Sequence, residues 1–199
     1  MIAIIDYGAG NLRSVGKAFE YMGFNARITG DIKLLKEASH IVLPGVGAFA
    51  DAVRVLKNSG MSDAIKKEIK KGKPFLGICL GMQLLFGRSF ENGGHKGLGL
   101  IPGTVAPIAG EGLKVPHMGW NSLHECKSAL LGGMDGGYVY FVHSFAAKGV
   151  PDKYTAATAD YSGRFPAAVN KDNIYGLQFH PEKSDETGLL ILRRFGGLK

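Results

Sequence analysis

Cysteine is scarce in this sequence of 199 residues, which contains only Cys79 and Cys126. Two cysteines are too few for a disulfide framework, and this usage is typical of a reducing cytosol. Long hydrophobic runs are missing too, since none approaches the ~20 residues that span a bilayer. The apolar run at residues 2–5 has no basic region before it, so we expect a strand there and no signal peptide. We therefore expect a cytoplasmic protein without a membrane partner.

Acidic residues are outnumbered, because 17 aspartates and glutamates face 24 lysines and arginines, and the formal net charge is +7. A positive charge raises the question of a nucleic-acid partner. However, the densest basic run, residues 66–73, ends a predicted helix that begins near Ser62. Cations there complement the negative end of the helix dipole, and Gly72 suits the position after the last turn. We interpret the run as a solvated helix end and expect no nucleic-acid partner.

A complete dinucleotide-binding fingerprint is also absent. Gly8 and Gly10 follow the first predicted strand, but Arg13 stands where the third glycine belongs. We expect neither a cofactor nor a metal site.

Glycine, in contrast, is abundant, with 30 residues, and strand and helix signals alternate along the first half of the chain. Strands are predicted at residues 2–6, 24–28, 40–43 and 75–78. Helices are predicted at residues 12–22, 31–37, 51–57 and 62–71, with Asn11 as the N-cap of the first. This alternation indicates βαβ units and a largely parallel sheet in one α/β domain spanning residues 1–199. Antiparallel strands added to the sheet are predicted at residues 98–108, 138–145, 154–161 and 174–179.

The stretch around Cys79 has the pattern of a nucleophile elbow. A buried strand at residues 75–78 leads directly into a predicted helix that begins at Leu80 and runs over residues 84–86. The flanking Gly77 and Gly81 leave room for a tight strand-to-helix turn, which holds the sulfur above the sheet and at a helix N-terminus. A buried, inert cysteine between two packing glycines is the alternative.

Two further segments follow predicted strands. The loop Pro44–Phe49 is rich in glycine and lies at the carboxyl edge of the sheet, where it forms either a plain turn or a set of free N–H groups for a ligand oxygen. Near the C-terminus, His180 and Glu182 follow the strand at 174–179. In extended chain they face the same way, so the carboxylate can orient the imidazole beside a thiol. His143 is the best competing histidine.

These segments together resemble class I (triad-type) glutamine amidotransferases. The motifs that carry the resemblance are residues 77–83 (GICLGMQ) and 178–184 (QFHPEKS). Three other motifs resemble the family of glutaminase subunits of imidazole glycerol phosphate synthase, namely residues 6–12 (DYGAGNL), 44–47 (PGVG) and 116–121 (PHMGWN). A fourth motif, residues 140–144 (YFVHS), fits the same family. The resemblance implies a flavodoxin-like three-layer domain with helices on both faces of a mixed sheet.

The resemblance also implies roles for individual residues. Cys79 would be the nucleophile, His180 the acid/base and Glu182 the group that orients it, while Val46 and Leu80 would supply oxyanion N–H groups. The residues that would line a glutamine pocket are Gly47, Gln83, Glu91, His143 and Ser144. The residues that would face a partner subunit are Asn11, Met118, Trp120, Tyr140 and Lys183.

The family implies hydrolysis of the glutamine side-chain amide through a thioester. The ammonia would pass to a (β/α)₈-barrel cyclase that forms imidazole glycerol phosphate and aminoimidazole carboxamide ribotide in histidine biosynthesis. The alternatives are the amidotransferase subunit of another synthase, such as anthranilate synthase, a redox-sensing module without catalysis, and a cysteine protease or other acyl transferase.

Overall fold

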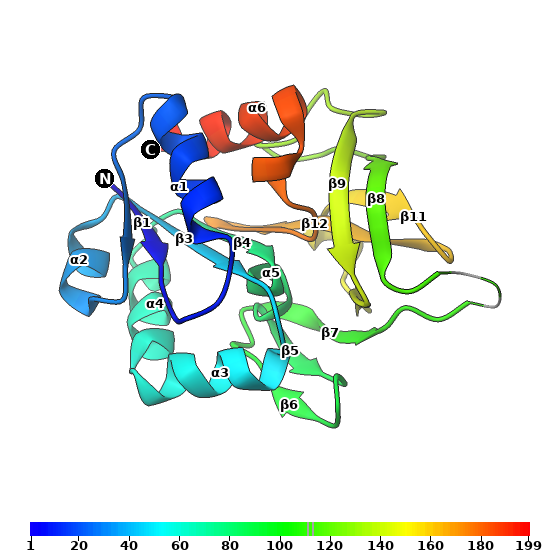
Figure 1. Cartoon of the computed structure of the whole chain (residues 1–199), viewed down its shortest axis with the longest axis horizontal. Helices are drawn as coiled ribbons and strands as arrows, with labels where there is room; N and C mark the ends of the chain where they lie inside the picture. The colour runs from blue at the N-terminus through cyan, green and yellow to red at the C-terminus, as the bar shows by residue number, and fades with distance from the viewer. Residues whose placement is uncertain (111, 113) are drawn as a thin grey trace.

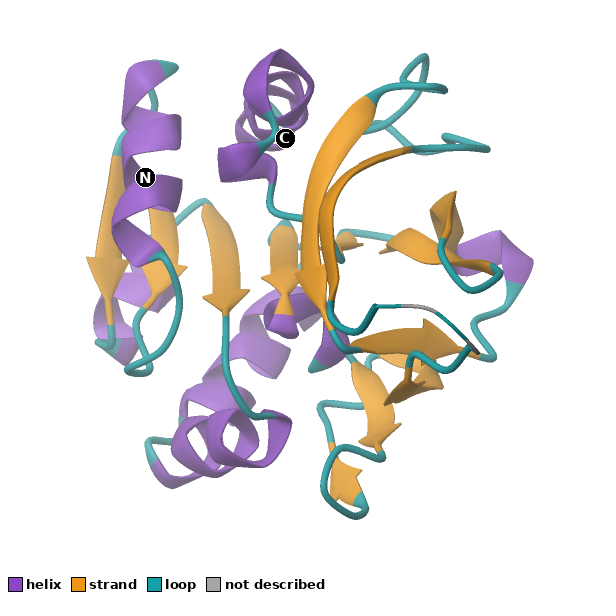
Figure 2. Cartoon of the chain, turned by 45° about the vertical axis from the view of Figure 1, so that its right-hand side comes forward, coloured by secondary structure: helices purple, strands orange, loops and turns teal. Residues whose placement is uncertain are grey.

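The computed structural model describes residues 1–110, 112 and 114–199. Its centre is a seven-stranded sheet with the strand order β11-β12-β13-β4-β3-β1-β2 (Figures 1 and 2). The five strands from β13 to β2 are parallel, whereas β11 and β12 are antiparallel to their neighbours. The strands are β1 (Ile2–Ile5), β2 (Ala26–Thr29), β3 (His40–Gly45), β4 (Phe75–Cys79), β11 (Thr155–Asp160), β12 (Arg164–Lys171) and β13 (Ile174–Leu177). The predicted mixed, largely parallel sheet is confirmed.

Helices cover both faces of this sheet (Figure 2). One face packs against α1 (Leu12–Tyr21) and α6 (Asp185–Gly196), with Phe19 and Phe195 fully buried in that core. The helices on the opposite face are α2 (Ile32–Glu37), α3 (Phe49–Asn58), α4 (Met61–Lys70) and the single turn α5 (Leu80–Gln83). Each amphipathic helix therefore buries its apolar stripe against the sheet, as a three-layer domain requires.

The second half of the chain builds two smaller sheets beside the central one. The first has the order β10-β7-β5-β6 and packs into the α3–α5 side of the core. Its strands are β5 (Phe86–Ser89), β6 (His95–Lys96), β7 (Ile101–Pro107) and β10 (Phe145–Lys148). The second is the antiparallel pair β8 (His117–Ser122) and β9 (Tyr138–His143). Short 3₁₀ turns, η1 (Asp152–Tyr154) and η2 (Pro181–Lys183), complete the structure.

Several local predictions were wrong. The helix after Cys79 ends at Gln83, and the carbonyl oxygens of Leu84, Leu85 and Phe86 accept from the backbone of residues 98–100 and do not continue the helix. Phe86 begins β5 instead. Asn11 stands at the start of α1, but its side chain makes no cap bond and accepts from the Ser14 hydroxyl at 2.8 Å. The β-type runs at 98–108 and 138–145 form the smaller sheets and do not extend the central one. The run at 174–179 joins the central sheet as β13, but it is parallel to β4 and is not an antiparallel addition.

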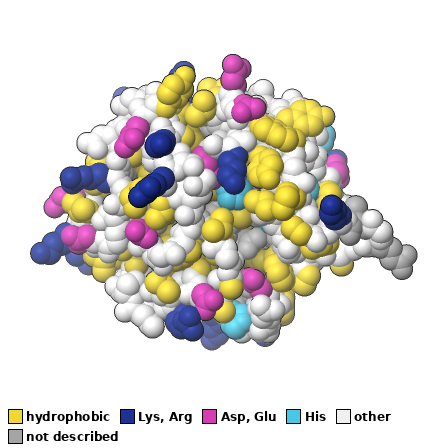
Figure 3. Space-filling view, in the orientation of Figure 1, with side chains coloured by type: hydrophobic (Ala, Val, Ile, Leu, Met, Phe, Trp, Pro, Cys, Tyr) yellow, Lys and Arg dark blue, Asp and Glu magenta, His cyan; other side chains and the backbone are white. Residues whose placement is uncertain are grey.

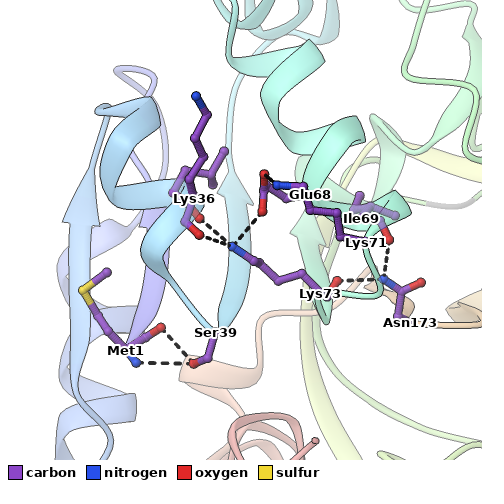
Figure 4. Close-up of polar contacts among 9 residues, drawn as sticks. Met1, Lys36, Ser39, Glu68, Ile69, Lys71, Lys73 and Asn173 are labelled. Atoms are coloured by element: carbon purple, nitrogen blue, oxygen red, sulfur yellow. Dashed lines mark hydrogen bonds and ion pairs between the residues drawn. The ribbon is translucent and has the colours of Figure 1, made fainter.

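A buried ion pair anchors the amino end of β4, opposite the end that carries Cys79 (Figure 4). Glu68 on α4 contacts the Lys71 ammonium at 2.6 Å and the Lys73 ammonium at 3.0 Å. Lys73 also donates to the carbonyl oxygens of Leu35 and Lys36, each at 2.9 Å. Lys73 therefore links α2, α4 and the start of β4, and Lys71 adds a second contact to Glu68. The hydrogen bond from Lys71 is the main cause that lowers the pKa of Glu68, and Lys73 adds to it against the opposing effect of burial.

Glu68→Ala should lower the free energy of unfolding by about 3 kcal/mol at neutral pH, because Lys73 is left buried without its counter-charge. The pKa of Glu68 is lower in the folded than in the unfolded state, so its contribution is present above the unfolded value of 4.5 and is lost as pH falls through the folded value. Urea denaturation at decreasing pH should show the difference shrinking. The exposed partner provides a control, since Lys71→Ala should cost about 0.5 kcal/mol or less. Equal stability of wild type and Glu68→Ala at neutral pH would contradict the role of this pair.

Candidate active site

Three neighbouring strands bring the predicted catalytic segments to one edge of the sheet. β4 lies between β3 and β13, and the register pairs Gly45 with Cys79 and Leu177 with Ile78. All three strands are parallel, so the segments that follow them meet at the carboxyl edge, where ligands of open α/β sheets bind. The loop after β3, the elbow after β4 and the segment that carries His180 are therefore adjacent, although they lie far apart in sequence.

Cys79 occupies a strained turn between β4 and α5. Its backbone has φ 54° and ψ −109°, a region that residues with a side chain rarely adopt. The flanking glycines permit this turn, because a Cβ at Gly77 would lie 2.5 Å from the Gly81 carbonyl oxygen and a Cβ at Gly81 would overlap the Leu43 carbonyl. The structure thus has the close backbone approach that the glycine spacing predicts. Since α5 is one turn long, its dipole is small, and positive charge near the sulfur has to come from a side chain.

That side chain is His180. Its Nδ1 lies 2.9 Å from Glu182 Oε1, and the two side chains are 3% and 1% exposed. Burial alone lowers the pKa of His180, but hydrogen bonding to Cys79 and Glu182 and the negative charges of both raise the pKa to about 10. Among the described residues, Nε2 has no other partner, and its interaction with the sulfur falls outside the ordinary distance or angle of a hydrogen bond. Such contacts often tighten only when substrate binds.

The His180 segment is held to strand β9 through its backbone. The His180 N–H donates to the Tyr140 carbonyl at 2.9 Å, and the Ser184 hydroxyl donates to the His180 carbonyl at 2.6 Å. The Ser184 hydroxyl also accepts from the Tyr140 N–H at 3.0 Å. The imidazole therefore sits on a backbone that is fixed against the β8–β9 hairpin.

His143, the competing histidine, has both ring nitrogens occupied. Nδ1 contacts the Phe145 carbonyl at 2.9 Å and Nε2 contacts His117 Nδ1 at 3.0 Å. Burial lowers the pKa of each of these two histidines to about 4, so both are neutral at pH 7. His117 is stacked between Phe141 and Tyr161. The His143 ring can wall the site, but it has no free nitrogen for acid/base work.

A cavity of about 330 Å³ lies over the sulfur and falls in the size range of small-molecule sites. Its lining includes every residue predicted for oxyanion and substrate binding, namely Val46, Gly47, Leu80, Gln83, Glu91, His143 and Ser144. Glu91 Oε2 accepts from the Phe49 N–H at 2.9 Å, which caps α3 with one carboxylate oxygen. A larger hollow of about 490 Å³ over β11 and β12 has no cysteine or histidine among the described residues that line it.

Four of the residues predicted to face a partner, Met118, Trp120, Tyr140 and Lys183, lie together around the β8–β9 hairpin. Met118 and Trp120 on β8 are 62% and 48% exposed, and the Trp120 ring meets the Tyr140 ring edge to face. The Lys183 ammonium lies 5.6 Å from the Tyr140 ring centroid. Figure 3 shows hydrophobic side chains gathered on this face over the β8–β9 hairpin. Asn11 begins α1 and is half-buried.

Sequence reasoning missed two side chains near the sulfur. Gln178 Nε2 donates to Cys79 Sγ at 3.8 Å, and Gln178 Oε1 accepts from Gln83 at 3.1 Å. Gln178 lies two residues before His180, so alternation along the predicted extended segment places the two side chains on one face, and a signal existed. Glu182 instead reaches His180 from the 3₁₀ turn η2, and the extended chain predicted for residues 180–182 was wrong. Tyr7 is buried beside Gly45, and no sequence pattern marks it.

Two properties of the described part of the chain bear on other classes of site. None of its helices has the length and apolarity needed to span a bilayer. Over the same residues, no group of three or more histidine, cysteine, aspartate or glutamate side chains is placed to hold a metal ion.

Comparison with known proteins defines the class. Residues 3–196 match the model of the family described as glutamine amidotransferase class-I. The crystal structure of a glutamine amidotransferase superposes with a TM-score of 0.79 at 18% identity, covering 100% of both chains. The structure of PurLQS from Thermotoga maritima superposes with a TM-score of 0.72 at 20% identity, over 98% of this chain and 96% of the other. The chain belongs to the class-I glutamine amidotransferases.

Sequence relatives narrow this class. The imidazole glycerol phosphate synthase subunit HisH of Caldanaerobacter subterraneus subsp. tengcongensis is 54% identical over 198 residues, which cover 98% of this chain and 97% of the relative. The subunit of the same name from Geobacter metallireducens is 54% identical over 202 residues, covering 98% and 96%. Within its class, the chain is therefore a member of the family of imidazole glycerol phosphate synthase subunit HisH.

Glu182→Gln should lower the pKa of His180, because it removes one of the charges that raise it. The imidazolium then persists over a narrower pH range, so iodoacetamide should alkylate Cys79 more slowly in the pH range where the variant has lost the imidazolium and the wild type has kept it. The rate is measured by mass spectrometry in a Cys126→Ser background, so that only Cys79 is labelled. Glu186→Gln, the same change on the exposed first turn of α6, is the control. An unchanged alkylation rate in Glu182→Gln at all pH values would contradict the coupling.

Proposed function

We propose that this chain hydrolyses the side-chain amide of glutamine and passes the ammonia to a partner subunit. The observation that supports this most directly is Cys79, which lines the 330 Å³ cavity, together with the buried and hydrogen-bonded pair of His180 and Glu182, whose side chains lie outside the cavity lining. A thiol with an adjacent imidazole, itself oriented by a carboxylate, has the arrangement needed for nucleophilic acyl transfer. We propose that residues 1–199 act as one amidotransferase domain without a cofactor.

In the first half of the reaction, the Cys79 thiolate attacks the carboxamide carbon and forms a C–S bond. The N–H groups of Val46 and Leu80 stabilise the negative charge that develops on the carbonyl oxygen; losing one such donor typically lowers the rate by ~10²–10³-fold. The intermediate collapses as His180 gives its proton to the nitrogen, the C–N bond breaks and ammonia leaves. The acyl group remains on the sulfur as a thioester.

In the second half, neutral His180 takes a proton from water, and the resulting hydroxide attacks the thioester carbon. The C–S bond breaks, glutamate leaves and the thiolate regains its imidazolium neighbour. Glu182 stabilises the imidazolium in both halves, because its carboxylate stays on Nδ1.

Substrate orientation follows from the groups that line the cavity. One oxygen of Glu91 caps α3, so the other is left to face the α-ammonium of glutamine. The amide nitrogen of Gln83 is engaged by the Phe145 carbonyl and by Gln178, which fixes the Gln83 side chain and leaves its oxygen for a donor on the substrate. Gly47, His143 and Ser144 complete the walls, the histidine through its backbone, since its ring is occupied.

The partner is proposed to be a (β/α)₈-barrel cyclase, because the relatives are named as subunits of imidazole glycerol phosphate synthase. With ammonia, the cyclase would form imidazole glycerol phosphate and aminoimidazole carboxamide ribotide in histidine biosynthesis. We propose docking through the face that carries Asn11, Met118, Trp120, Tyr140 and Lys183, since aromatic residues are enriched in interface cores. This reaction belongs in the cytoplasm and needs no nucleic acid or membrane.

Cys79→Ala should abolish glutamate release while complex formation with the cyclase subunit stays intact. Glutamate release is measured from the purified complex with glutamine and the cyclase's nucleotide substrate. The matched control is Cys126→Ala, which should retain wild-type turnover, because Cys126 is a half-buried thiol whose pKa is raised to about 11 by burial and by Asp135. Glutaminase activity that survives in Cys79→Ala would overturn the proposed function.

Glu91→Gln should raise the KM for glutamine about tenfold or more and change kcat little, because it removes a charge-assisted bond to the α-ammonium. The amide retains an oxygen that can accept from the Phe49 N–H, so the α3 cap and the thermal midpoint should survive. Glu91→Ala is the companion variant, expected to lose the cap as well and therefore about 1 kcal/mol of stability. A wild-type KM in Glu91→Gln would exclude Glu91 from substrate binding.

A further inference from the structure

Buried polar atoms without a partner are few in the described residues, and most of them lie at the proposed active site. Four side-chain atoms in these ranges are fully buried without a hydrogen-bond partner: Tyr7 Oη, Ser128 Oγ, His180 Nε2 and Glu182 Oε2. The two on His180 and Glu182 belong to the catalytic cluster. Tyr7 follows β1, which lies next to β3, and its side chain also reaches this edge of the sheet. A buried hydroxyl without a partner is unfavourable, so it calls for a role.

The Tyr7 hydroxyl lies between the loop after β3 and the elbow after β4. A Cβ built on Gly45 would meet Tyr7 Oη first, then Leu80 Cβ at 3.0 Å and the Gly81 N at 3.3 Å. Tyr7 packs in the core on the α3–α5 side of the sheet, whereas Cys79 packs in the core on the α1–α6 side. The hydroxyl and the sulfur therefore approach the loop from opposite sides.

The loop itself can rearrange. Val46 and Gly47 are exposed, and Gly47 has φ 103° with nothing within 4 Å of a Cβ built on it. A peptide between glycine-flanked residues rotates at low cost. Its N–H and C=O point in opposite directions, because the peptide bond is trans. If the Val46 N–H turns toward the sulfur side, the Gly45 carbonyl must turn away from it, toward the side on which Tyr7 Oη lies.

We propose that the Tyr7 hydroxyl donates a hydrogen bond to the Gly45 carbonyl when the Val46 N–H faces the oxyanion, and so positions the loop for catalysis. The inference rests on the proposed glutaminase reaction. Tyr7 is 8% exposed and touches the loop and not the reacting atoms, so it is a positioning residue. In the loop conformation described here, the Tyr7 hydroxyl has no hydrogen-bond partner, so this conformation is the resting state. Pairing in the active state would shift the equilibrium between the two conformations toward the active one.

Tyr7→Phe tests this inference because it removes the hydroxyl and keeps the ring. In the complex with the cyclase subunit, kcat for glutamate release should fall about tenfold, which corresponds to about 1.4 kcal/mol, while KM for glutamine is unchanged. The thermal midpoint of the free chain should be unchanged or higher, because the resting state loses no bond. A structural role would instead lower the midpoint and the activity together.

Tyr175→Phe is the matched control. Tyr175 is a second buried tyrosine, near the amino end of β13 and in register with Leu76, away from the loop. Its kcat should equal that of the wild type. Wild-type kcat in Tyr7→Phe, or a fall in kcat accompanied by a fall in midpoint, would overturn the role of Tyr7. These results are distinct from failure of the proposed function, in which the wild-type complex and Cys79→Ala would release glutamate equally.

Discussion

The proposed chemistry depends on the turn that the backbone makes between β4 and α5. That turn exists because Gly77 and Gly81 carry no side chain where the chain folds back on itself and on the Leu43 carbonyl. The backbone of Cys79 is strained, because its φ is positive, and the surrounding sheet holds it in this conformation. In return, its sulfur stands at the carboxyl edge between the ends of β3 and β13. The loop after β3 and the His180 segment after β13 are brought to that point by neighbouring parallel strands, and Glu91, His143 and Ser144 line the cavity from segments of the smaller sheets.

Burial alone does not decide the charge of the histidines around this turn. His117 and His143 are buried against each other and have pKa values lowered to about 4. His180 is buried to the same degree, yet its pKa is raised to about 10, because Glu182 and the sulfur hold the charged form. The same fold therefore contains a neutral pair that shapes the cavity wall and a charged histidine beside the nucleophile. The difference is made by the sulfur of Cys79 and by the carboxylate of Glu182.

The parts of this arrangement that could be predicted are those determined by residues close together in the sequence. Strand–helix alternation indicated the parallel sheet, and residues close in sequence, such as Gly77 with Cys79 or His180 with Glu182, carry their geometry with them. Strands β8 and β12 and helix α6 were not predicted as elements, since their stability comes from contacts with distant segments. Ile191, Leu192 and Phe195 do form an apolar stripe on α6, so that helix was detectable. The role of Tyr7 could not be predicted, because it depends on the contact of its hydroxyl with Gly45, which lies on a neighbouring strand.

The coupling of sulfur, imidazole and carboxylate is tested most directly by NMR titration of the His180 ring in a chain labelled with ¹⁵N-histidine. The ring should stay protonated through neutral pH and lose its proton only near pH 10, while His117 and His143 stay neutral down to about pH 4. A His180 ring that titrates near the ordinary value of 6.5 would show that the three groups do not act as one unit.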